Sequence, residues 1–203
     1  MSEHHAWLQT AGGRVVDALD TAPEGIEIAD IAAGLSNAPR YAGQTVGFYS
    51  VAMHSVRMSA LLYHGDAAAE SEDNYAARWA LLHDASEAYL CDLPTPVKYE
   101  LPDYRRLETR LQNRILKRFG LGLVMPLEVQ EADARMLATE VRDLLVAHSL
   151  VWGLLREAYE FHVAFHSPAE ARYAFEQQAR LLGLWTDGTA TEGTAENGEG
   201  RHG

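Results

Sequence analysis

The stretch LLHDASEAYL, from Leu81 to Leu90, constrains the fold most, because it places His83 and Asp84 inside an apolar, helix-forming pattern. Glu87 follows one helical turn later. A helix that packs into a core excludes unpaired charge, since burying an ionised carboxylate without compensation is very costly. Any fold of this chain must therefore bring a compensating group to His83 and Asp84.

Helical spacing of apolar residues also dominates the rest of the chain. The segment Ser167–Pro168–Ala169–Glu170 has the pattern of a capping box with proline at the first helical position. Pro94 and Pro96 predict that no helix continues through that region. No segment reads as a strand, so the sequence predicts an all-α protein. The expected helices run over about Ile26–Asn37, Ser50–His64, Asn74–Leu90, Asp103–Phe119, Leu127–His148 and Ser167–Leu184.

Length and composition indicate one folded domain with two terminal extensions. The 203 residues are enough for one substantial core. We expect a lead-in over residues 1–25, a helical domain over 26–185, and a disordered tail over 186–203, which lacks apolar anchors. The single cysteine, Cys91, cannot form an internal disulfide, which favours a cytoplasmic setting.

Net charge and hydropathy narrow the range of partners. The formal net charge of −12 argues against polynucleotides, because a phosphate backbone needs a basic face. A small phosphorylated molecule needs only one or two local cations or a metal ion. No stretch reaches the ~18 consecutive apolar residues of a membrane span, so we expect no membrane partner.

Four polar residues on three predicted helices share the same anomaly of lying on apolar faces. Two imidazoles and two carboxylates suit a divalent cation such as Mn²⁺, Co²⁺, Fe²⁺, Ni²⁺ or Zn²⁺, and suit Mg²⁺ less well. The sequence therefore predicts one bound divalent metal ion. The expected ligands are His54, His83, Asp84 and Asp133.

Each of these residues also has a simpler interpretation. A histidine on an apolar face is often a hydrogen-bonded core residue, and Asp133 could pair with Arg135 or Arg142. Glu87 lies on the same face as His83 and Asp84 and could transfer protons beside the metal. An exposed surface glutamate is the alternative for Glu87.

Three motifs in this order resemble the HD-domain metal-dependent phosphohydrolases. They are YSVAMHS from Tyr49 to Ser55, LLHDASEAYLCDLPTPVK from Leu81 to Lys98, and EADARMLATE from Glu131 to Glu140. The middle motif is similar to that of the bacterial 5′-deoxynucleotidases, and the first motif is similar to phage and bacterial HD nucleotide hydrolases. The resemblance covers roughly residues 26–185 and implies a helical bundle in which the four ligands above hold one metal ion.

The resemblance also implies roles for further residues. Glu87 and Asp92 correspond to the family's proton-transferring acids. Arg40 corresponds to a phosphate-binding arginine and Tyr41 to the aromatic residue near the sugar, which is Trp in the deoxynucleotidases. The loop after Leu90 brings Lys98 to the rim of the same site.

The resemblance implies metal-dependent hydrolysis of a (deoxy)nucleotide phosphate, most directly of a nucleoside monophosphate. The alternatives are a (deoxy)nucleoside triphosphohydrolase, and a non-catalytic HD module that binds a ligand. Relatives of this kind are often homodimers. The expected substrate is therefore a small nucleotide and the expected cofactor a single divalent cation.

Overall fold

The computed structural model describes residues 7–18, 20, 22–65, 71–147 and 153–185. Most of these residues are helical, which confirms the all-α class, and the predicted tail over 186–203 lies outside them. None of the described helices combines the length and the apolar composition that a membrane crossing needs. The α-helices are Ile28–Asn37 (α1), Val51–Leu61 (α2), Tyr75–Leu82 (α3), Glu87–Leu90 (α4), Thr95–Tyr99 (α5), Pro102–Arg118 (α6), Leu127–Leu144 (α7) and Pro168–Leu181 (α8).

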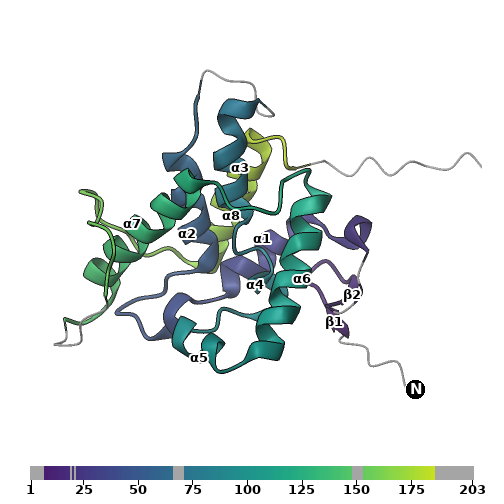
Figure 1. Cartoon of the computed structure of the whole chain (residues 1–203), viewed down its shortest axis with the longest axis horizontal. Coiled ribbons are helices and arrows are strands. Elements are labelled where there is room, and N and C mark those ends of the chain that lie inside the picture. Colours follow the sequence, from purple (N-terminus) through teal and green to yellow (C-terminus); the bar gives the residue numbers. More distant parts are fainter. Residues whose placement is uncertain (1–6, 19, 21, 66–70, 148–152, 186–203) are drawn as a thin grey trace, which may run out of the picture.

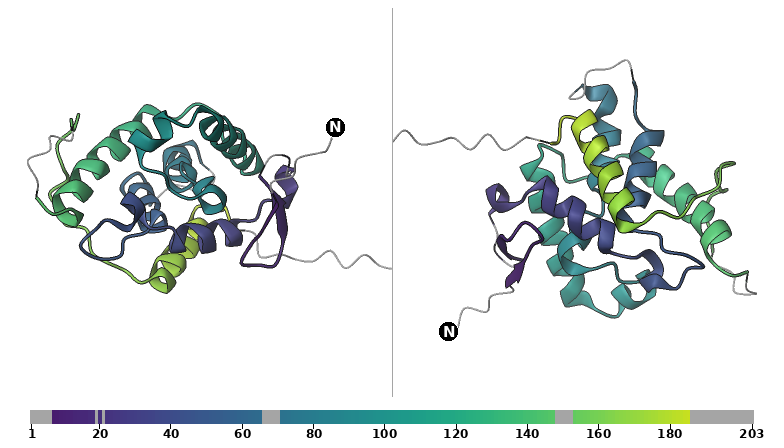
Figure 2. Two further views of the ribbon diagram at one scale, coloured as in Figure 1. Left: turned by 90° about the horizontal axis from the view of Figure 1, so that it is seen from below. Right: turned by 180° about the vertical axis from the view of Figure 1, so that it is seen from behind.

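Helices α2 and α3 form the centre of the molecule and pack extensively against each other (Figure 1). Seen from below, α6 and α7 form an arc along one side of this pair, and α1 and α8 lie on the other side (Figure 2). The view from behind shows α8 lying across the central helices. The core between these layers is mostly aliphatic, with Tyr49 and Phe175 as its largest fully buried side chains. Its other fully buried members include Ile31, Leu35, Met58, Leu81, Leu82, Leu111, Ile115 and Met136.

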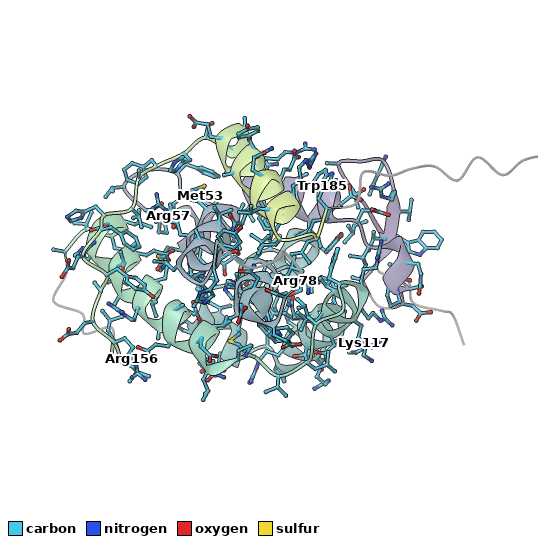
Figure 3. All side chains as sticks on the ribbon, turned by 90° about the horizontal axis from the view of Figure 1, so that it is seen from above. Met53, Arg57, Arg78, Lys117, Arg156 and Trp185 are labelled. Atoms are coloured by element: carbon cyan, nitrogen blue, oxygen red, sulfur yellow. The ribbon has the colours of Figure 1, made fainter. Side chains whose placement is uncertain are left out.

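Local signals in the sequence set the ends of several helices. The hydroxyl of Ser50 caps α2 by accepting a hydrogen bond from the amide of Met53 (3.2 Å). Ser167 and Glu170 form the predicted capping box of α8. Arg78, labelled in Figure 3, extends from α3 and donates to the carbonyl oxygen of Phe119 at the end of α6 (3.2 Å). This last contact joins the central layer to the outer arc.

The prediction that the chain has no strands is wrong at its start. Trp7–Gln9 (β1) and Val15–Asp17 (β2) pair as a small antiparallel hairpin, with Trp7 opposite Asp17. Three residues per strand are too few to show the alternation by which a strand is recognised. Gly13, at φ +80°, adopts the left-handed conformation that the turn requires.

The helix predicted over Asn74–Leu90 is interrupted, and the proline-rich segment after it is helical. The chain leaves the helix at His83 and resumes it at Glu87, so α3 and α4 are separate. Helix α5 forms despite its proline because Pro96 lies in the first turn, where the missing N–H is not needed. Helix α7 ends at Leu144 rather than near His148.

Candidate metal centre

The break between α3 and α4 aims His83 and Asp84 at one point. Backbone hydrogen bonds across the break are of the tight i to i−3 kind, as from Ala85 to Leu82 (3.1 Å). The side-chain amide of Gln112 on α6 bridges the two ends, donating to the carbonyl of Leu82 (2.7 Å) and accepting from the amide of Ser86 (2.9 Å). A neighbouring helix thus replaces the helical hydrogen bonds that the break removes.

The two histidines lie at the bottom of the site and face each other. His54 of α2 is completely buried, and its Nε2 lies 3.3 Å from Nε2 of His83. The same Nε2 atom of His54 lies 3.3 Å from Oδ1 of Asp133 on α7. Oδ2 of Asp84 lies 3.0 Å from Nε2 of His83. The structure therefore brings together all four residues that the sequence predicted as metal ligands.

The partners of the two Nδ1 atoms orient both imidazole rings. Nδ1 of His54 faces Oε1 of Glu140 (2.7 Å), and Nδ1 of His83 faces the carbonyl oxygen of Ala80 (2.7 Å). Both partners are acceptors, so each Nδ1 donates its hydrogen to its partner, and each Nε2 is directed inward, toward Asp133 or Asp84. Two ring nitrogens 3.3 Å apart repel each other unless a proton or a metal ion lies between them.

The spacing fits a metal ion of ordinary size. Two nitrogens that each lie about 2.1 Å from one ion are about 3.3 Å apart when the angle between them is about 105°. Ligand atoms of His54, His83 and Asp133 all lie within 4.8 Å of one another. The donor set of imidazole and carboxylate, with acceptors behind both imidazoles, therefore fits a divalent cation.

Exposure differs between the two kinds of ligand. The side chains of His54 and His83 are 0% and 2% exposed, whereas those of Asp84 and Asp133 are 27% and 44% exposed. The simpler pairing of Asp133 with an arginine is wrong in the described residues, since Arg142 binds Asp143 and Arg135 donates to the carbonyl of Glu157. The histidines thus form the floor of the site and the aspartates its rim.

Electrostatics at the centre favour positive charge. Burial lowers the pKa of His83, but the carboxylates of Asp84 and Asp133 outweigh burial and raise it to about 9. Burial raises the pKa of Asp84, yet His83 and Arg40 hold it well below its usual range. The site therefore stabilises negative carboxylates around a place where a proton or a metal ion must reside.

Glu87 and Lys98 meet beside this centre. The carboxyl group of Glu87 is buried, and its Oε1 accepts from Nζ of Lys98 (2.7 Å), which also donates to Glu108 (2.7 Å). Oε2 of Glu87 has no hydrogen-bond partner among the residues that the structure describes. Burial and the charges of Asp84 and Asp92 raise the pKa of Glu87 well above its usual range. The alternative of an exposed surface glutamate is wrong.

Arg40 and Tyr41 also reach the site, through a residue to which the sequence analysis gave no role. Oε2 of Glu140, on α7, accepts from Nε of Arg40 (2.9 Å) and from the hydroxyl of Tyr41 (2.9 Å). Nη1 of Arg40 lies 3.7 Å from Oδ2 of Asp84. The sequence signal that could have identified Glu140 is its spacing: it follows Asp133 by seven residues, two helical turns, and so lies on the same face of α7.

A cavity of about 210 Å³ adjoins the metal centre on the side of α6. His83 and Asp84 lie on its wall, opposite residues of α6 such as Glu108 and Gln112. Lys98 contributes the cation of this wall, although it is paired with the two glutamates. The pKa of Asp92, the second predicted proton donor, is raised by burial. The arrangement offers ligands for a cation, proton-transferring acids and a space beside them.

Comparison with known proteins identifies the same part of the chain. A family model described as 5′-deoxynucleotidase YfbR-like matches residues 48–148. The uncharacterized protein YfdR of Escherichia coli is 44% identical over 130 residues, which cover 64% of this chain and 67% of YfdR. The uncharacterized protein RCAP_rcc00048 of Rhodobacter capsulatus is 41% identical over 200 residues, covering 87% of this chain and 95% of that protein.

A third relative has a named activity but a shorter match. The 5′-deoxynucleotidase plu3092 of Photorhabdus laumondii is 41% identical over 56 residues, which cover 26% of this chain and 25% of that protein. The matched family region, 48–148, contains all four candidate metal ligands and Glu87. It does not reach Arg40 and Tyr41.

Proposed function

The chain belongs to the YfbR-like 5′-deoxynucleotidase family of the HD superfamily, and we propose that it hydrolyses the 5′-phosphate ester of (deoxy)nucleoside monophosphates with one divalent cation. The observation that carries this proposal is the pair of inward-facing Nε2 atoms, 3.3 Å apart and flanked by Asp84 and Asp133. Such a pair needs a proton or a metal ion between its nitrogens, and the two carboxylates favour a metal ion there.

Four side chains would hold the cation: His54, His83, Asp84 and Asp133. When bound, a divalent cation lowers the pKa of a coordinated water molecule and withdraws charge from a phosphoryl oxygen. The identity of the ion is left among Mn²⁺, Co²⁺, Fe²⁺, Ni²⁺ and Zn²⁺, with Mg²⁺ the less suitable choice.

The protein's own groups would supply the proton transfers and the charge on the phosphate. Oε2 of Glu87, buried and without a partner among the described residues, would accept a proton from the attacking water. The new bond joins the water oxygen to phosphorus, and the bond from phosphorus to the 5′ oxygen breaks. Asp92, whose pKa burial raises, would return a proton to that leaving oxygen.

Arg40 and Tyr41 would bind the nucleotide beside the metal centre. Glu140 accepts from Nε of Arg40, and Nη1 lies 3.7 Å from Asp84, so the guanidinium group is held beside the metal centre, where it would contact a phosphate. The ring of Tyr41 would lie against the sugar. Lys98, paired with Glu87 and Glu108, would contribute positive charge at the rim rather than a free ammonium group. A cytoplasmic location and a homodimer remain predictions from the sequence and the resemblance.

A substrate panel tests the proposal. Purified protein, stripped of metal and reloaded with each of Mn²⁺, Co²⁺, Ni²⁺, Zn²⁺ and Mg²⁺, would be incubated with dAMP, AMP, dATP and a cyclic dinucleotide. We expect inorganic phosphate from dAMP, and none from the Asp84→Ala variant. Triphosphate released from dATP would instead assign a triphosphohydrolase. If no ion supports release from any substrate, the alternative of a ligand-binding module is favoured.

A further inference from the structure

Glu140 occupies an unusual position for a carboxylate. It lies on α7, is completely inaccessible to solvent, and sits two helical turns after Asp133. A fully buried carboxylate persists only when charged or strongly donating partners saturate it. Its partners therefore indicate what it is there to hold.

The two oxygens of Glu140 serve two different parts of the site. Oε1 accepts from Nδ1 of His54, a candidate metal ligand (2.7 Å). Oε2 accepts from Nε of Arg40 and from the hydroxyl of Tyr41, both 2.9 Å away. His54 belongs to α2, whereas Arg40 and Tyr41 belong to a segment that precedes it. One carboxylate thus joins the floor of the metal centre to the segment expected to bind nucleotide.

The segment Arg40–Gly43 needs such an anchor because its backbone is strained. Tyr41 and Ala42 have φ angles of +57° and +51°, and Gly43 follows at +75°. The left-handed conformation crowds Cβ against the following carbonyl in every residue except glycine, so it persists only where the surroundings impose it. The hydrogen bond from the Tyr41 hydroxyl to Glu140 is one of the contacts that impose it.

We propose that Glu140 is a positioning residue that couples the affinity for the metal ion to the conformation of Arg40–Gly43. With its charge in place, Glu140 keeps the hydrogen of His54 on Nδ1 and leaves Nε2 free to bind the ion. The same charge orients Arg40 and Tyr41. That Arg40 and Tyr41 bind nucleotide rests on the proposed function. The coupling between the metal ion and the segment does not depend on that function.

The isosteric change Glu140→Gln separates the two oxygens chemically. An amide has one acceptor and one donor end, so it cannot accept from His54 on one side and from Arg40 and Tyr41 on the other. If its NH₂ group faces His54, the imidazole hydrogen moves to Nε2, where it blocks the metal. If its NH₂ group faces Arg40, two donors oppose each other and the segment loosens.

Tyr41→Phe and Asp30→Asn provide matched comparisons. Tyr41→Phe removes one hydrogen bond on the segment side and leaves the contact between Glu140 and His54 intact. Asp30 is also a buried carboxylate bound to an arginine, Arg14 (2.9 Å), but it lies on α1 beside the hairpin. Its change to asparagine controls for the loss of a buried charge as such.

The experiment measures Co²⁺ affinity by calorimetry and hydrogen exchange over residues 39–50, with and without Co²⁺. We expect Glu140→Gln to weaken Co²⁺ binding by roughly 10- to 100-fold, the usual range for a lost outer partner of a metal-binding histidine. Exchange over 39–50 should also become faster. Tyr41→Phe should accelerate exchange and, because the coupling acts in both directions, should weaken Co²⁺ binding slightly, by less than about threefold. Asp30→Asn should alter neither quantity, and Glu140→Asp should recover part of the affinity.

Nitrogen NMR of the histidine rings gives a reading that a general loss of stability would not reproduce. In the folded Glu140→Gln protein, the signals of His54 should show an altered tautomer, whereas those of His83 keep theirs. Unchanged Co²⁺ affinity together with an unchanged His54 tautomer would overturn the coupling. If the coupling holds but no nucleotide is hydrolysed, only the proposed function fails. If nucleotide is hydrolysed and Glu140→Gln binds Co²⁺ normally, only the coupling fails.

Discussion

Replacing Glu87 with glutamine should abolish most of the activity while leaving the metal ion bound. In the structure Oε1 of Glu87 accepts from Lys98 at 2.7 Å, and Oε2 is buried without a partner among the described residues. An amide must turn its oxygen toward the ammonium group of Lys98. Its NH₂ group then occupies the place of Oε2, so a donor replaces the proton acceptor at the position next to the metal centre.

The expected fall in rate is that of an enzyme which loses its general base while the side chain at this position keeps its shape. Such a loss costs about 10²- to 10⁴-fold in rate. We expect kcat to fall roughly 10²- to 10³-fold, which corresponds to about 3–4 kcal/mol of transition-state free energy. Glutamine has nearly the volume of glutamate, so metal content and thermal stability should change little. The four predicted ligands are untouched by the substitution.

The pH dependence provides a second reading. Burial and the charges of Asp84 and Asp92 raise the pKa of Glu87 above that of an ordinary glutamate. A base works in its deprotonated form, so kcat/KM should rise with pH through this raised pKa, and it should fall again at the pH where Asp92, the proposed proton donor, loses its proton. This acidic limb should be absent from the Glu87→Gln protein. The assay is phosphate release from dAMP between about pH 4 and 9, with metal content measured in parallel.

Glu108→Gln is the matched comparison. Glu108 also accepts from Lys98 at 2.7 Å, so this change removes an equivalent ion pair without touching the proposed base. We expect its kcat to fall by less than about tenfold, with the acidic limb retained. Equal losses in the two variants would mean that Glu87 acts only by pairing with Lys98. Full activity in Glu87→Gln with normal metal content would refute its role as a base.

Three further predictions use the same protein. Arg40→Ala should raise KM for dAMP and lower kcat/KM by roughly 10- to 100-fold, because a charge-assisted contact to phosphate is lost; an unchanged KM would place the phosphate elsewhere. Tyr41→Ala should change the ratio of kcat/KM for dAMP and AMP, and equal slowing of both would mean that another residue selects the sugar. Lys98→Met should lower the unfolding free energy in urea by about 3 kcal/mol at pH 7, because it leaves the buried carboxylate of Glu87 without its cation. This deficit should shrink as pH falls through the raised pKa of Glu87, since the protonated carboxyl group needs no cation, and a deficit independent of pH would contradict the assignment.

Periodicity predicted the layout of the helices well because burial of one face governs them. The apolar residues Ile28, Ile31 and Leu35, which recur at helical spacing in α1, are all buried, and Ser167 caps α8 as its pattern indicates. Periodicity also indicated the metal ligands, because they are polar residues at positions where the helical pattern predicts apolar ones. His54 could be recognised in this way because no core leucine position tolerates an imidazole without a partner.

Features that depend on distant contacts could not be predicted in this way. The break after α3 is held by Gln112, which lies on another helix and carries no local signal of that role. Glu140 lies two helical turns after Asp133 on α7, but its partners Arg40 and Tyr41 lie 100 and 99 residues earlier in the chain. Periodicity identifies which residues point inward, whereas it contains nothing about which inward residues meet.

The balance of charge explains why the site needs both its cation and its arginine. Carboxylates outnumber basic side chains at the metal centre and beside it. Asp84, Glu87, Asp92, Glu108, Asp133 and Glu140 stand against Arg40 and Lys98. A phosphate dianion would be repelled by such a surplus. The pKa of His83, raised to about 9, means that a proton takes the position of the missing positive charge at neutral pH. A divalent ion must displace that proton when it binds. Its larger positive charge then offsets the carboxylates, so that the site can accept a phosphate group.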